Sequence, residues 1–148
     1  MENSPKMVDI LLVEDNPGDI RLTQEALKEG NLRNTLSVVM DGEEALDFLR
    51  RRGKFADSKR PDLILLDLNL PKLNGHEVLA EIKKDEDLRH IPVVVLTTSD
   101  DERDITFSYN QFASSYIVKP VSLEKFIKVV AAVKDYWLEI VKFAPGAK

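Results

Sequence analysis

The sequence predicts an α/β fold in which a doubly wound, five-stranded parallel sheet carries helices on both faces. Three short aliphatic runs, at residues 10–13, 63–66 and 93–96, predict its central strands. None of these runs alternates between apolar and polar residues, which is typical of strands buried on both faces of a parallel sheet. Helical patterns fill the gaps between the runs, and parallel neighbours require such crossover connections. Together these observations predict five strands that alternate with five helices.

The first strand is followed by signals for a helix and then for a weaker strand. Asn16 and Pro17 are typical of an N-cap and of the first helical position, and they predict a helix that ends near Gly30. Residues 36–40 predict the second strand. Asp41 can cap the next helix, whose buried positions fall at helical spacing: Ala45, Leu46 and Leu49.

The same alternation continues through the second half of the chain. A third helix is predicted over 75–84, with three positions that face inward: Val78, Leu79 and Ile82. A fourth helix is predicted over 101–112, and residues 115–118 predict the last strand. The final helix starts after Pro120 and has apolar residues at helical spacing: Phe126, Val129, Val130, Val133 and Trp137.

The basic run at 50–52 allows two interpretations. It could bind a phosphate group. Cations also suit the C-terminal end of a helix, where they interact favourably with the helix dipole. We prefer the second interpretation, in which the run is the solvated end of the second helix.

Composition places the chain among soluble globular proteins. Its 148 residues are 43% hydrophobic and 32% charged, which suffices for one domain with its own core. We predict that this domain covers residues 8–143, between loose tails at 1–7 and 144–148. The absence of cysteine excludes disulfides, thiolate metal sites and cysteine nucleophiles.

Charge and hydropathy narrow the class further. The net charge of -5 disfavours non-specific attraction to nucleic acid, so no nucleic-acid partner is expected. No apolar run reaches the roughly 20 residues that cross a bilayer. The first residues also lack the apolar core of a secretory signal. We therefore expect a cytoplasmic protein without a membrane partner.

Polar residues follow the buried runs, at the sheet edge where ligands bind. In an open parallel sheet, ligands lie beyond the carboxyl ends of the strands. The residues at these ends supply three carboxylates, two hydroxyls and an ammonium: Glu14, Asp15, Asp67, Thr97, Thr98 and Lys119. Taken singly, each has an ordinary explanation as a turn, a helix cap, a strand residue or a solvated cation. Their coincidence at one edge favours a shared site.

Three carboxylates in one place repel one another, and a divalent cation removes that conflict. Mg²⁺ favours oxygen ligands and also binds phosphate oxygens, while Lys119 can neutralise a further phosphate charge. Thr97 can donate a hydrogen bond. The set suits an aspartate nucleophile that attacks phosphorus while metal and lysine offset the charge on the transferring oxygens.

Five segments give the chain a specific resemblance to the response-regulator receiver family, over about residues 8–141. They are 10–15 (ILLVED), 63–71 (LILLDLNLP), 74–75 (NG), 94–97 (VVLT) and 116–120 (YIVKP). The resemblance implies the flavodoxin-like (β/α)5 receiver fold and Mg²⁺-dependent phosphoryl transfer from a sensor histidine kinase. A receiver catalyses only its own phosphorylation and dephosphorylation, so we do not expect an enzyme that acts on other substrates.

Carried over by position, the resemblance implies a role for each matching acidic residue. Asp67 would accept the phosphoryl group. Glu14 and Asp15 would be the acidic pair that holds Mg²⁺, Asp15 directly and Glu14 through water. Asp67 and the backbone carbonyl of Asn69 would complete the metal ligands from the protein.

Further matching positions imply a conformational switch. Thr97 resembles the hydroxyl that moves toward the phosphoryl group, and Tyr116 resembles the aromatic residue that changes rotamer with it. Lys119 would contact the acyl phosphate, and its peptide bond to Pro120 would be cis.

The wider pattern, including 93–99 (VVVLTTS) and 136–139 (YWLE), is similar to stand-alone receivers paired with cyanobacterial phytochromes and related sensor kinases. Too few residues follow Lys119 for a helix-turn-helix domain, so we expect the output to be a protein contact made by the receiver itself. The resemblance implies a homodimer that uses the fourth and fifth helices and the last strand. Its aromatic candidates, which could instead fill the core, are Phe107, Tyr109, Phe112 and Trp137.

Two other functions remain open. A phosphatase or phosphotransferase with Asp67 as nucleophile would need a second nearby acid for acid/base work, which Asn69 cannot supply. A degenerate receiver that serves as a constitutive binding module would not need the complete set of aspartate, threonine and lysine.

Overall fold

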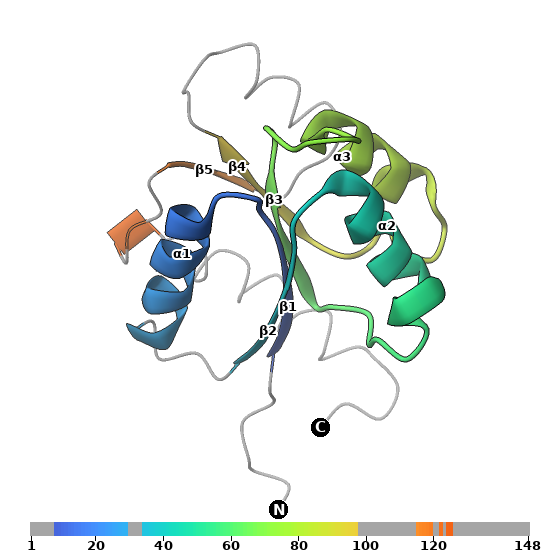
Figure 1. Ribbon diagram of the computed structural model, residues 1–148, viewed down its shortest axis with the longest axis horizontal. Helices are drawn as coiled ribbons and strands as arrows, with labels where there is room; N and C mark the ends of the chain where they lie inside the picture. Colours follow the sequence, from blue (N-terminus) through green and yellow to red (C-terminus); the bar gives the residue numbers. More distant parts are fainter. Residues whose placement is uncertain (1–7, 30–33, 98–114, 120–121, 123, 126–148) are drawn as a thin grey trace, which may run out of the picture.

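The computed structural model describes residues 8–29, 34–97, 115–119, 122, 124 and 125. Its strands form one parallel sheet in the order β2-β1-β3-β4-β5 (Figure 1). The strands are β1 (Val8–Val13), β2 (Asn34–Val39), β3 (Leu63–Asp67), β4 (Val93–Thr97) and β5 (Ser115–Val118). The predicted five-stranded parallel sheet is therefore confirmed.

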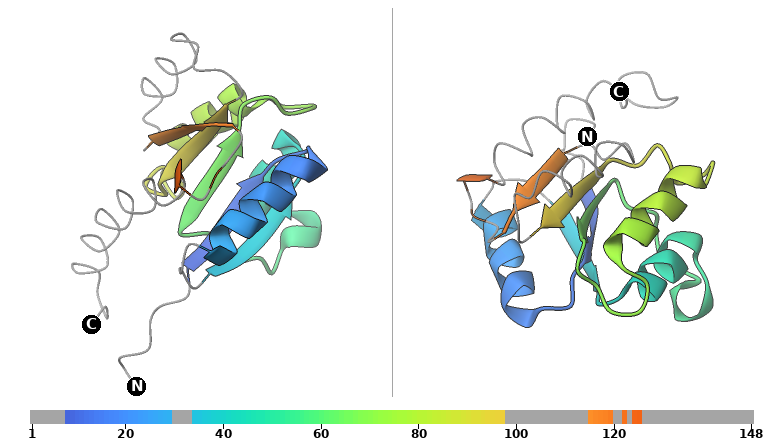
Figure 2. Two further views of the ribbon diagram at one scale, coloured as in Figure 1. Left: turned by 90° about the vertical axis from the view of Figure 1, so that its left-hand side faces the viewer. Right: turned by 90° about the horizontal axis from the view of Figure 1, so that it is seen from above.

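Helices cover both faces of this sheet. They are α1 (Pro17–Glu29), α2 (Gly42–Arg50) and α3 (Gly75–Lys84), together with a short 3₁₀ turn, η1 (Gly53–Phe55). The helix α1 lies on one face, whereas α2 and α3 lie side by side on the other (Figures 1 and 2). None of these helices, nor any other helix within the described residues, is long and apolar enough to cross a membrane.

Several predictions fall on residues that the structure does not describe. The predicted fourth helix, the two tails, and the final helix apart from residues 124 and 125 lie outside the described ranges. The same holds for the aromatic dimer candidates, Phe107, Tyr109, Phe112 and Trp137.

The first two helices begin at the polar residues that the sequence indicated. The Asn16 side chain accepts a hydrogen bond from the backbone N–H of Asp19 at 3.0 Å. Asp41 accepts one from the N–H of Glu44 at 2.8 Å. Such caps satisfy backbone N–H groups that have no partner inside the helix. Helix α3 begins with a capping box between Asn74 and Glu77, and its cap was not among our sequence predictions.

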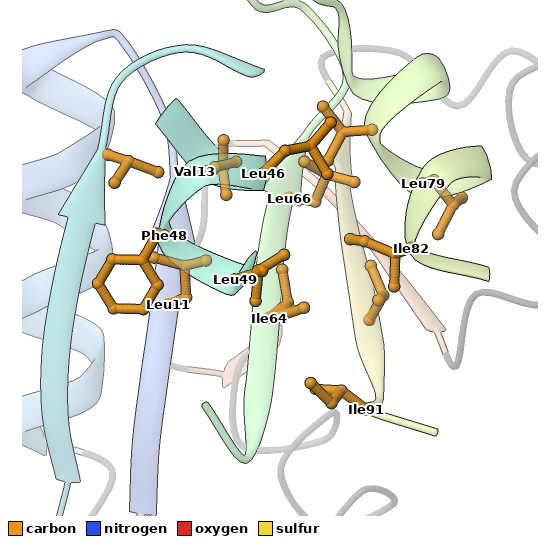
Figure 3. Packing of buried hydrophobic residues seen from close by; sticks show 14 of the residues in the cluster. Leu11, Val13, Leu46, Phe48, Leu49, Ile64, Leu66, Leu79, Ile82 and Ile91 are labelled. Carbon is orange, nitrogen blue, oxygen red and sulfur yellow. The ribbon is translucent and has the colours of Figure 1, made fainter. Parts of the chain in front are cut away.

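Alternate residues of the central strands point to opposite faces, and both sets are buried. On the α2 and α3 side, Leu11, Ile64 and Leu66 pack with apolar residues of the two helices (Figure 3). On the α1 side, Leu12 and Leu65 pack in a second cluster. Burial on both faces explains why these runs are aliphatic without alternation.

The basic run ends α2, in agreement with the interpretation that we preferred. Arg50 lies in the last turn, and its guanidinium is 3.2 Å from Glu81 and 3.6 Å from Asp85. Arg51 follows in a left-handed conformation, with φ of 58°, and caps the helix. These contacts link the end of α2 to α3.

Candidate functional site

The carboxyl ends of three strands bring four of the predicted residues together. Glu14 and Asp15 follow β1, Asp67 is the last residue of β3, and Lys119 follows β5. One oxygen each from Glu14, Asp15 and Asp67 lie within 4.8 Å of one another. The chain therefore gathers three carboxylates at one edge of the sheet, beyond the parallel neighbours β1 and β3.

The acidic residues are held by the local backbone. Glu14 is fully buried, and its side chain accepts a hydrogen bond from the N–H of Asn16 at 3.2 Å. Asp67 is 2% exposed, and its Oδ1 accepts one from the N–H of Asn69 at 3.1 Å. Asp15 is the most exposed of the three acids. The site is therefore open to solvent on the Asp15 side and closed behind Glu14.

A close approach of α3 to β3 positions the loop after Asp67. A Cβ atom on Gly75 would lie 2.3 Å from the carbonyl oxygen of Asp67 and 2.5 Å from the Cα of Leu68. Real Cβ atoms do not approach backbone so closely, so only glycine fits here. The N–H of Gly75 donates to the carbonyl of Leu68 at 3.1 Å. Gly75 thus allows the loop that carries Asn69 to fold back over the strand end.

The Lys119 ammonium lies among three carboxylates. Its Nζ is 2.8 Å from Glu14 Oε1, 3.1 Å from Asp67 Oδ2 and 3.0 Å from Asp19 Oδ2. The lysine side chain is only 7% exposed. A buried cation requires such partners, because burial alone disfavours the charged form.

Asp19, in the first turn of α1, was not among the predicted site residues. Acids are common in the first turn of a helix because they interact favourably with the helix dipole. The position of Asp19 in that turn alone therefore gave no indication of a role in the site. Its position at the same sheet edge, five residues after Glu14, is the signal that could have revealed it.

The site shifts the pKa values of Glu14 and Lys119. Burial and the neighbouring Asp67 raise the pKa of Glu14 to about 7, although the hydrogen bond to Lys119 opposes the rise. Burial by itself would lower the pKa of Lys119. The hydrogen bonds to Glu14 and Asp19 and the charge of Asp67 outweigh that effect and raise it. The carboxylates therefore carry more negative charge than one ammonium can offset.

This imbalance and the chemistry of the donors fit a divalent cation. Apart from its ion pair with Lys119, Glu14 Oε1 accepts no hydrogen bond from the described residues, although it is buried. Three carboxylates supply hard oxygen donors, the type that Mg²⁺, Mn²⁺ and Ca²⁺ prefer. The acidic group of Glu14, Asp15 and Asp67 could therefore hold a metal ion.

The structure places the predicted switch residues only in part. Thr97 ends β4 beside Val118 of β5, but its side chain lies outside the described part of the chain. Tyr116 lies in β5, is half-buried, and packs against the core cluster of α2 and α3. The peptide bond between Lys119 and Pro120 also falls outside the described residues.

Comparison with known proteins identifies the class that this fold and this site define. A family model described as the response regulator receiver domain matches residues 10–131. The chain therefore belongs to the response regulator receiver family.

The relatives of this chain include a regulator associated with a phytochrome. The chain is 49% identical to response regulator Rcp1 of Synechocystis over 139 residues, which covers 94% of the chain and 93% of Rcp1. The crystal structure of the phosphorylated cyanobacterial phytochrome response regulator RcpA superposes with a TM-score of 0.77 at 49% identity, covering 91% of this chain and 96% of RcpA. The Mn²⁺-bound form of Rcp1 gives a TM-score of 0.76 at 48% identity, covering 89% of this chain and 95% of that one. The chain is a receiver-domain response regulator of the Rcp1 type.

Proposed function

We propose that Asp67 accepts a phosphoryl group from a sensor histidine kinase in a Mg²⁺-dependent reaction, and that phosphorylation switches a protein-interaction surface. The observation that carries this proposal is the position of Asp67. Its carboxylate lies within 4.8 Å of two other acids and 3.1 Å from the Lys119 ammonium. Negative groups at a metal site beside a buried cation form an environment suited to a transferring phosphoryl group.

The proposed step is a displacement at phosphorus. A carboxylate oxygen of Asp67 attacks, a P–O bond to Asp67 forms, and the bond from phosphorus to the donor breaks. The donor leaves with the electron pair of that bond. Lys119 lies on the Oδ2 side of the carboxylate, where its charge can stabilise the phosphoryl oxygens as they arrive.

Asp15, Asp67 and the backbone carbonyl of Asn69 are the proposed direct protein ligands of the metal, and Glu14 would bind it through water. Mg²⁺ bound there would offset part of the negative charge on the transferring oxygens. The N–H of Asn69 already bonds to Asp67, which places this residue beside the carboxylate. The Mn²⁺-bound form of Rcp1 supports divalent-cation binding, because Rcp1 is a relative of this chain.

The relatives also suggest the partner and the output. RcpA is described as a phytochrome response regulator and as phosphorylated, which supports a phytochrome-type sensor kinase as the phosphodonor here. We further propose that the receiver itself makes the output contact, as a homodimer that uses the part of the chain from the predicted fourth helix onward.

Intact-mass measurement after incubation with acetyl phosphate and Mg²⁺ tests the phosphorylation proposal. We expect a phosphoryl adduct on the wild type and on Asp57→Asn, an exposed control of the same chemistry. The adduct should be absent from Asp67→Asn. Turnover of many phosphate esters would instead indicate a phosphatase, and the lack of any adduct would indicate a receiver that binds without being phosphorylated.

A further inference from the structure

The Lys119 ammonium has as many carboxylate partners as it has N–H donors. A protonated lysine offers three N–H groups. Three carboxylate oxygens lie within 3.1 Å of Lys119 Nζ, from Glu14, Asp19 and Asp67. A phosphoryl oxygen on Asp67 would need one of these donors. Esterification removes the negative charge of the Asp67 carboxylate, but the phosphoryl group brings up to two negative charges in its place and competes with Glu14 and Asp19 for the ammonium.

The two carboxylates that remain, Glu14 and Asp19, differ in how readily they can release the ammonium. Glu14 is fully buried, whereas the side chain of Asp19 is 27% exposed. A carboxylate that gives up a cation must be rehydrated, and burial makes this costly. Asp19 already reaches water, so its release costs the least.

Asp19 also stands apart from the proposed metal site. The acidic group that could hold a metal consists of Glu14, Asp15 and Asp67, without Asp19. A bound cation would therefore offset the charge of Glu14 and Asp67 and leave Asp19 with Lys119 as its partner. The ion pair joins the first turn of α1 to the end of β5, across 100 positions of sequence.

We propose that Asp19 is a positioning residue that competes with the phosphoryl group for Lys119. It holds the ammonium in the unphosphorylated protein and releases it when Asp67 is phosphorylated. This inference rests on the proposed phosphorylation of Asp67 and adds a residue that regulates it. Loss of the Asp19 charge removes one of the groups that compete with the phosphoryl group for Lys119, so it favours the phosphorylated state.

The test compares Asp19→Asn with Glu25→Gln, which removes an exposed acid from the same helix. Two quantities are measured at saturating Mg²⁺: the initial rate of adduct formation with acetyl phosphate, and the dissociation constant of fluoroberyllate, an unreactive stand-in for the phosphoryl group. Ion pairs that reach water contribute up to about 1 kcal/mol, and the Asp19 side of this pair reaches water. Asp19→Asn should therefore speed the reaction and tighten fluoroberyllate binding about three- to fivefold. Glu25→Gln should match the wild type.

General repulsion between Asp19 and an anionic donor could produce the same acceleration without any competition. The same substitution is therefore made in a Lys119→Gln background, with Lys119→Ala as a second background if the first does not fold. Competition for the ammonium predicts that Asp19→Asn has no effect once the ammonium is absent. An effect of equal size in both the wild-type and the lysine-free background contradicts the inference.

The remaining outcomes separate the inference from the proposed function. If the wild type is phosphorylated but Asp19→Asn is unchanged or slower, the inference is wrong and the phosphorylation proposal stands. If the wild type forms no adduct and binds no fluoroberyllate, both fail.

Discussion

The Lys119 ammonium lies 2.8 Å from the Glu14 carboxylate, although β3 and β4 separate their strands in the sheet. Glu14 follows β1 and Lys119 follows β5, so the ion pair spans the carboxyl edge of the central strands. Asp67 lies between them at the end of β3 and contacts the same ammonium. A metal ion or phosphoryl group that neutralises the charge of one of these three residues therefore also changes the electrostatic environment of the other two.

The raised pKa of Glu14 predicts an unusual dependence of stability on pH in the metal-free protein. Its folded-state pKa, about 7, exceeds the ordinary value of 4.5, so the folded protein holds more protons between these pH values. This contribution to stability is present below about pH 4.5 and is lost as the pH rises through about 7. The loss amounts to at most about 3 kcal/mol. Urea unfolding in EDTA at pH 5 and pH 8 measures it.

Glu14→Gln is the control for this pH effect, since the amide cannot titrate. The difference in the free energy of unfolding between the two pH values should be smaller in the variant than in the wild type. An identical pH dependence in both proteins would show that Glu14 is not the titrating group.

Asp15→Asn should weaken Mg²⁺ binding without unfolding the protein. The residue is the most exposed of the three clustered acids, so its loss removes a charged ligand but little packing. We expect the affinity for Mg²⁺ to fall about tenfold or more. Calorimetric titration measures the affinity, with Asp57→Asn as the control. Unchanged binding in Asp15→Asn would place the metal elsewhere.

Lys119→Ala should still bind Mg²⁺, because it removes a cation and no oxygen ligand. Loss of the ammonium beside Glu14 and Asp67 leaves their negative charge for the metal, so the affinity should be equal or higher. Phosphorylation should be transmitted poorly to the partner surface. Lys28→Ala, an exposed lysine of α1, is the control. A normal response of self-association or partner binding to phosphorylation in Lys119→Ala would contradict the role of this lysine.

Gly75→Ala should disturb the loop after the phosphoryl acceptor. The added methyl group would lie 2.3 Å from the backbone oxygen of Asp67, which must shift. We expect a loss of about 1–3 kcal/mol in the free energy of unfolding and slower adduct formation. Gly18→Ala serves as the matched control, because among the described residues its Cβ would meet only the side chain of Asn16, at 3.2 Å. Equal stability of the two variants would argue against the close approach of α3.

The central strands could be predicted from sequence because burial on both faces requires short aliphatic runs without alternation, a pattern that the other elements of this fold do not need. Strand ends were harder to predict. The edge strand β2 begins at Asn34, two residues before the prediction, since Asn34 and Thr35 are polar and add nothing to the apolar pattern that predicted the strand. The turn η1 was missed because Gly53 to Phe55 has no apolar periodicity.

The convergence of acids at the sheet edge followed from one rule, that parallel strands end at a common edge. That rule brings Glu14, Asp15, Asp67 and Lys119 to one place, where the structure also has them. It says nothing about residues inside the following helix, which is why Asp19 was missed. Its contact with Lys119 depends on the distance between α1 and β5, which no local pattern encodes.

Chemical mapping of the phosphorylated residue tests the central claim most directly. Borohydride reduces an acyl phosphate of aspartate to homoserine, so treatment after incubation with acetyl phosphate and Mg²⁺ marks the acceptor for peptide mass spectrometry. We predict homoserine at position 67 in the wild type, and none without the phosphodonor. Homoserine at Asp15 instead, or at no aspartate in a protein that nevertheless gained a phosphoryl group, would contradict the assignment of Asp67.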